Sequence, residues 1–144
     1  MDRITIVGMG PISTSIGLGL KQASLPDIEI VGTSGNNKSL KTVLKMGAVD
    51  STTGNLGSAV TNANLVILDT HVGETQEILS AISPLLSNDC IITDISHVKV
   101  PILEWADKNL PETVSFIGGR PLPKTTPVEI EEANPSIFEG ADYC

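Results

Sequence analysis

The chain alternates short apolar runs with longer segments whose apolar residues recur every three or four positions. Short apolar runs bounded by glycine, proline or polar residues are typical of buried strands, whereas helical spacing predicts amphipathic helices. The pattern predicts strands over residues 4–7, 28–33, 65–68, 90–93 and 114–117, with a short further strand beginning at Val49. It predicts helices over residues 12–23, 39–46, 56–63, 73–86 and 98–109.

Strands that alternate with helices predict a chain of βαβ units. Right-handed crossovers then give a mostly parallel sheet with helices on both faces, which is a doubly wound α/β fold of the Rossmann type. The length of 144 residues fits one domain, residues 1–144. Hydrophobic residues make up 40% of the chain but aromatic residues only 3%, so the core must consist mainly of Ile, Leu, Val and Ala. The proline-rich stretch 120–135 is expected to be irregular and to cover a surface.

Charge and cysteine content narrow the possible partners. A net charge of −8 argues against general affinity for nucleic acid or for anionic membranes, which require an excess of Lys and Arg. Cys90 and Cys144 are too few and too far apart for a disulfide framework or a metal site. The N-terminus lacks the form of a signal peptide, and no run of about 20 apolar residues exists. We therefore expect a cytoplasmic protein with a small-molecule ligand.

A glycine-rich loop follows the first predicted strand, where a dinucleotide fingerprint has to lie. Gly8 permits a tight turn, and Gly10 lets the backbone approach a pyrophosphate. Pro11 and Ile12 open the following helix, whose N-terminus offers unpaired N–H groups and a partial positive charge. Ser13 replaces the third glycine of the pattern; it is small, and its hydroxyl could cap the helix or bind a phosphate. The alternative is a structural turn on a fold that has lost its ligand.

The turn after the second strand indicates which nicotinamide cofactor is bound. NAD-binding chains usually carry an acid there to hold the ribose 2′-hydroxyl. This chain has none between Thr33 and Lys38, and its hydroxyls, amides and lysine could accept a 2′-phosphate instead. The residues expected to contact the cofactor there are Thr33, Ser34, Gly35, Asn36 and Lys38. The turn favours NADP over NAD, although Lys38 could equally be an ordinary exposed lysine.

With these elements placed, the chain resembles the N-terminal domain of the prephenate/arogenate dehydrogenase family over nearly its whole length. The motifs that carry the resemblance are residues 4–10, 45–50, 93–94 with 98–99, 116–119 and 137–143. Members of that family oxidise prephenate or arogenate with NAD(P), transferring a hydride to the cofactor as the ring loses carbon dioxide. The resemblance implies that Asp69, Thr70 and His71 lie beside the dinucleotide. Asp94 and Ser96 complete the expected cofactor-binding residues.

The chain departs from the family pattern where the chemistry would take place. The family usually has a Gly-Ser pair where this chain has Ser96-His97, and Gly-Gly-His-Pro where it has Gly118-Gly119-Arg120-Pro121. The family histidine deprotonates the substrate hydroxyl, which an always-protonated arginine cannot do. We therefore consider His97 as a substitute base, against the alternative of a cofactor-side or merely exposed histidine, and Arg120 as a bidentate partner for a substrate carboxylate. His71, which replaces a proline, is expected to pack on the dinucleotide or face solvent.

Family enzymes continue into a helical domain that completes the substrate pocket and forms a homodimer, and the sequence stops about where that domain would begin. We therefore expect this chain alone to bind cofactor without turning over substrate. Two other functions remain open: a non-catalytic dinucleotide-binding or regulatory module that has lost its base, and an NADP dehydrogenase for another carboxylate substrate.

Overall fold

The computed structural model describes all residues, 1–144, and its centre is a six-stranded parallel sheet with the strand order β3-β2-β1-β4-β5-β6. Its strands are β1 (Asp2–Val7), β2 (Ile28–Thr33), β3 (Ser51–Thr53), β4 (Leu65–Leu68), β5 (Ile91–Asp94) and β6 (Ser115–Gly118). The order reverses between β1 and β4, which are hydrogen-bonded neighbours. This is the doubly wound Rossmann arrangement, in which ligands bind beyond the carboxyl ends of the strands at the reversal.

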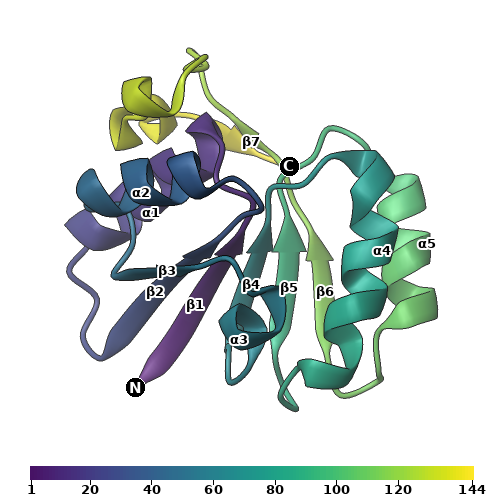
Figure 1. Cartoon of the computed structure of the whole chain (residues 1–144). Helices are drawn as coiled ribbons and strands as arrows, with labels where there is room; N and C mark the ends of the chain where they lie inside the picture. The colour runs from purple at the N-terminus through teal and green to yellow at the C-terminus, as the bar shows by residue number, and fades with distance from the viewer.

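Five helices cover the sheet on both faces. They are α1 (Pro11–Gln22), α2 (Asn37–Lys45), α3 (Leu56–Val60), α4 (Val72–Ile82) and α5 (Val100–Asn109). Figure 1 shows α1 and α2 on one side and α4 with α5 on the other. All pairings within the sheet are parallel, so the carboxyl ends of its strands lie along one edge.

Alternating side chains of the central strands divide the core into two clusters. On β4, Val66 and Leu68 pack with residues of α3, α4 and α5, whereas Ile67 packs with residues of α2. This alternation is what a strand covered on both faces requires. Cys90 is buried and unpaired in the first of these clusters, as a small core residue.

Several predicted boundaries are shifted by one or two residues, and three differ for a physical reason. The third strand begins at Ser51, not at Val49, whose side chain is buried in the core between the turn and the sheet. The helix predicted over 56–63 ends at Val60, because Asn62 adopts a positive φ of 61°. The helix predicted over 73–86 ends at Ile82 and continues only as a 3-10 turn, Ser83–Leu85, that contains a proline.

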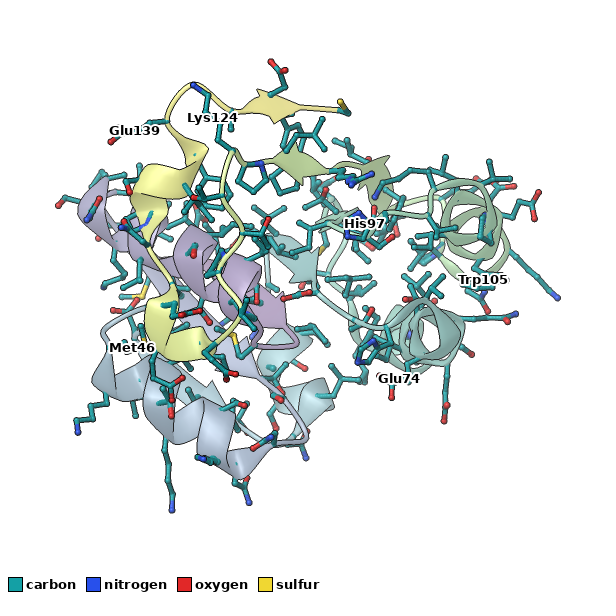
Figure 2. The ribbon with its side chains drawn as sticks, turned by 90° about the horizontal axis from the view of Figure 1, so that it is seen from above. Met46, Glu74, His97, Trp105, Lys124 and Glu139 are labelled. Carbon is teal, nitrogen blue, oxygen red and sulfur yellow. The ribbon has the colours of Figure 1, made fainter.

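The segment after β6 is more ordered than its composition predicts. Residues Pro121–Leu122 (β7) pair antiparallel with Asp142–Tyr143 (β8), and two 3-10 turns, Ile130–Glu132 and Pro135–Phe138, lie between them. The turns lie against α1, where the N–H of Asn134 donates to Ser15 Oγ (3.0 Å). The segment thus covers the α1 side of the carboxyl edge (Figure 2, yellow).

Candidate functional site

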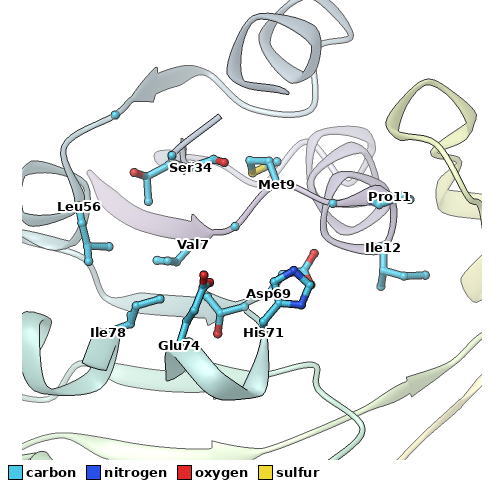
Figure 3. A pocket seen from close by; sticks show the side chains of 16 residues that line it. Val7, Met9, Pro11, Ile12, Ser34, Leu56, Asp69, His71, Glu74 and Ile78 are labelled. Carbon is cyan, nitrogen blue, oxygen red and sulfur yellow. The ribbon is translucent and has the colours of Figure 1, made fainter. Parts of the chain in front are cut away.

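A pocket of about 540 Å³ opens at the carboxyl edge where the strand order reverses. It lies between the loop after β1, the end of β2 and the first turn of α4 (Figure 3). The residues that line it are Val7, Gly8, Met9, Gly10, Pro11, Ile12, Thr33, Ser34, Gly35, Gly54, Leu56, Asp69, Thr70, His71, Glu74 and Ile78. Ten of the residues expected to contact a cofactor are therefore brought together here.

The glycine loop has the geometry that the sequence predicted. Gly8 has a φ of +86°, and a Cβ there would overlap the backbone oxygen of Asp69. Ser13 is fully buried and holds the loop: its Oγ accepts from the Gly10 N–H (3.0 Å) and donates to the Gly8 carbonyl (3.0 Å). The Ser13 hydroxyl therefore stabilises the turn from within and does not line the pocket.

The loop leaves backbone donors available at the start of α1. The N–H groups of Ile12 and Ser13 donate to no acceptor in the chain, since the helix begins at Pro11. Unpaired N–H groups at a helix N-terminus, reached across a glycine without a Cβ, form a seat for phosphate. The backbone of this loop therefore fits the pyrophosphate of a dinucleotide.

The end of β2 contributes hydroxyl and backbone groups. Thr33, Ser34 and Gly35 line the pocket, and no acid lies among them. Asn36 and Lys38 do not line the pocket. The Asn36 side chain caps α2 by accepting from the N–H groups of Lys38 (3.0 Å) and Ser39 (3.1 Å). The exposed Lys38 side chain makes no ion pair.

A second pocket of about 460 Å³ adjoins the first. The two share a wall made of Ile12, Asp69, Thr70 and His71. The rest of its lining comes from Val72 at the start of α4 and from the segments after β5 and β6, namely Ile95, Ser96, His97, Val98, Arg120, Pro121, Leu122, Pro123 and Thr126. Figure 2, which looks onto this edge, shows His97 there.

Two side chains of the second pocket carry the departures from the family pattern. Arg120 is half-buried, and its Nε has neither solvent contact nor a hydrogen-bond partner. His97 is exposed on the loop that joins β5 to α5. Ser96, expected at the cofactor, lines this second pocket instead, where its Oγ donates to the Val98 carbonyl (2.8 Å).

Asp94 was expected beside the cofactor, but it does not line the first pocket. Its carboxylate is buried and lines neither pocket, because it is bound to Lys99 (Nζ–Oδ2 2.6 Å). Lys99 also donates to the carbonyl of Gly119 (2.6 Å), and the N–H of Gly119 donates to Asp94 Oδ1 (3.4 Å). This buried clasp of Asp94, Lys99 and Gly119 joins the loops that carry His97 and Arg120.

Six residues that line the first pocket were not among the expected site residues: Val7 and Met9 of the glycine loop, and Gly54, Leu56, Glu74 and Ile78. Leu56 and Ile78 fit the helical apolar pattern and gave no separate signal. Glu74 could have been found from its place in the first turn of the helix that follows β4.

Comparison with known proteins identifies the family. The family model for the nucleotide-binding domain of prephenate dehydrogenase matches residues 16–144. The chain belongs to this family. The prephenate dehydrogenase of Bacillus subtilis (strain 168) is 29% identical over 99% of the chain, and that of Lactococcus lactis subsp. cremoris is 34% identical over 99%. The chain spans only 38% and 40% of the length of these two relatives.

Solved structures agree with this assignment. Prephenate dehydrogenase from A. aeolicus in complex with hydroxyphenyl propionate and NAD+ superimposes with a TM-score of 0.87 at 25% identity, over 99% of this chain and 49% of that one. Synechocystis arogenate dehydrogenase gives 0.84 at 28% identity, over 98% and 48%. The chain is thus a nucleotide-binding domain of this oxidoreductase family. No helix has the length and apolar character needed to cross a membrane.

Proposed function

We propose that this chain is the NADP-binding domain of a dehydrogenase that acts on a prephenate-like or arogenate-like carboxylate. The observation that carries the proposal is the wall shared by the two pockets. A ligand in the second pocket would lie directly beside a dinucleotide bound in the first, which is the proximity that hydride transfer requires. When bound, the nicotinamide supplies the hydride acceptor.

The turn after β2 supports NADP over NAD. Thr33 and Ser34 present hydroxyl groups to the pocket and Gly35 its backbone, with Lys38 one turn further along. A carboxylate at this position would repel a 2′-phosphate, and none is present.

The second pocket supports a carboxylate substrate. Arg120 lines this pocket, and its guanidinium is permanently charged, so it can pair with a carboxylate bound there. His97 supplies an imidazole to this pocket, a group that commonly acts as a general base. We assign to His97 the removal of the substrate hydroxyl proton and to Arg120 the orientation of the substrate.

One observation favours a second function. Arginine stands where the family has its catalytic histidine, so the chain could be a dinucleotide-binding module without catalysis. In either case the rest of the pocket, and a homodimer interface, would come from a helical domain beyond this chain.

Calorimetric titration of the chain with NADP and NAD tests the proposal. We expect tighter binding of NADP, and we expect Ser34→Asp to reverse the preference by placing a carboxylate where the ribose binds. Gly54→Ser, a small uncharged polar change in open space at the end of the neighbouring strand β3, is the control for the added charge and should preserve the preference. Binding of neither nucleotide would contradict the proposal, and tighter binding of NAD would contradict the assignment of the turn.

Hydroxyphenyl propionate, titrated into the nucleotide-loaded chain, separates the two functions. Binding that Arg120→Met weakens supports a substrate pocket. Binding of nucleotide alone, with no carboxylate response, favours the module without catalysis.

A further inference from the structure

The side chain of Asp69 lies where the pyrophosphate of a dinucleotide must approach. Asp69 follows β4, and its N–H donates to the Val7 carbonyl (2.7 Å), which fixes its backbone beside the glycine loop. A Cβ built on Gly10 would lie 2.9 Å from Asp69 Oδ2. The carboxylate therefore fills the space that the missing side chain of Gly10 leaves open.

Nothing in the protein neutralises this carboxylate. It forms no ion pair and accepts no hydrogen bond, unlike Asp50 and Asp94, which each have a lysine partner. The pocket contains a second carboxylate, Glu74, and neither Lys nor Arg. Figure 3 shows Asp69 and Glu74 on the side of the pocket opposite Met9 and Pro11.

Two attractions and one repulsion then act on a bound pyrophosphate. The unpaired N–H groups and the partial positive charge at the start of α1 attract it. A full negative charge at contact distance from Gly10 opposes them, and at such distances like charges repel strongly unless water or salt screens them.

We propose that Asp69 sets the nucleotide affinity of the pocket by lowering it. Its carboxylate occupies the approach to Gly10, so a dinucleotide binds only when this side chain is displaced or its charge is screened. The inference rests on the proposed function, since it requires that the pocket bind a dinucleotide. The competing role is a favourable one, in which the carboxylate accepts a hydrogen bond from a ribose hydroxyl.

Calorimetric titration of Asp69→Asn, Asp69→Ala and the unchanged chain with NADP and NAD tests this inference. Asparagine keeps the shape and removes the charge, whereas alanine removes the side chain. We expect both variants to bind the preferred nucleotide about 10-fold more tightly at low ionic strength, and the gain to shrink as salt is added. Glu77→Gln, on the exposed face of α4 outside the pocket, is the control for net charge and should change affinity less than about twofold.

The outcomes separate the two proposals. A ribose contact would make Asp69→Ala bind more weakly than the unchanged chain, which would overturn the inference while leaving dinucleotide binding intact. Equal affinity of all variants would overturn it as well, as would an equal gain from Glu77→Gln. If neither the unchanged chain nor the Asp69 variants bind, with folding verified by circular dichroism, both the inference and the proposed function fail.

Discussion

The two pockets at the carboxyl edge are built in different ways. The cofactor pocket is shaped by backbone: a positive φ at Gly8, a missing Cβ at Gly10 and unpaired N–H groups at the start of α1. The second pocket is defined by side chains on the loops after β5 and β6, above all His97 and Arg120. In the backbone-built pocket the glycine loop follows the family pattern and only His71 departs from it, whereas the side-chain-built pocket departs from it at Ser96-His97 and Arg120.

The difference shows which part of a dehydrogenase domain can change without loss of the fold. Phosphate recognition by backbone N–H groups needs only a turn and a helix start, so it tolerates substitutions around it. Proton transfer needs one titratable group at one place, so a single replacement such as Arg120 changes the chemistry. The two pockets also depend on different interactions, backbone geometry in the first and side-chain contacts in the second. Mutations can distinguish the two.

The largest effect is expected at the turn of the cofactor pocket. Gly8→Ala places a Cβ against the Asp69 carbonyl and imposes a positive φ on a residue that disfavours it. We expect a loss of about 3 kcal/mol in the free energy of unfolding, because neither backbone can move without disturbing the β1–β4 pairing. Thermal unfolding followed by circular dichroism measures it.

Gly35→Ala is the matched control for this turn. Gly35 lies in the same pocket, has open space around its Cα and has no positive φ. Its substitution should change stability by less than about 0.5 kcal/mol. Equal melting temperatures for Gly8→Ala and the unchanged chain would show that the turn is not constrained in this way.

The sequence predicted the fold well because its periodicity is a local property. Every strand of the six-stranded sheet and every α-helix was expected, and the errors lie at ends that depend on tertiary contacts. Asn62 has a positive φ just beyond the end of α3, and Pro84 lies in the 3-10 turn that follows α4. Val49 was predicted to begin a strand, whereas its side chain is buried in the core just before β3. The β7–β8 pair joins segments about 20 residues apart and has no local signature.

The cofactor pocket was also largely predictable, for the same reason. Its glycines are read from a motif, and the turn after β2 follows from the strand that precedes it. The bond of Lys99 to Asp94 could not be predicted, because it depends on how the loops after β5 and β6 meet. Motif position placed Asp94 at the cofactor, but its charge is used to join those loops.

The clasp of Asp94, Lys99 and Gly119 gives the second prediction. Lys99→Met leaves a buried carboxylate without its cation, which we expect to lower the free energy of unfolding by about 2 kcal/mol. Nucleotide affinity should change less than about twofold, since no clasp residue lines the cofactor pocket. Chemical denaturation and calorimetry measure the two effects.

Lys108→Met controls for the loss of a lysine from α5, because Lys108 is exposed and forms no ion pair. It should be neutral within about 0.5 kcal/mol. The double variant Asp94→Asn with Lys99→Met should recover part of the stability, because no charge is then left buried. A large fall in nucleotide affinity for Lys99→Met would show that the two pockets are not independently held.

The smallest effect is expected at Asp50, where an exposed ion pair with Lys21 on α1 supports the cofactor half of the sheet. Burial raises the pKa of Asp50, but the bonds from Lys21 and from the Ile30 N–H (2.8 Å) outweigh it and lower the pKa below 3.8. A carboxyl group with a lowered pKa in the folded state stabilises the protein at higher pH, and this stabilisation is lost as pH falls through the folded-state pKa.

Asp50→Asn should therefore lower the free energy of unfolding by about 0.5–1 kcal/mol at neutral pH, a small effect because both side chains are about one-third exposed. Denaturation of both proteins from neutral pH to below 3.8 should show the difference closing in acid; a difference independent of pH would mean that Asp50 acts through its shape and not through its charge.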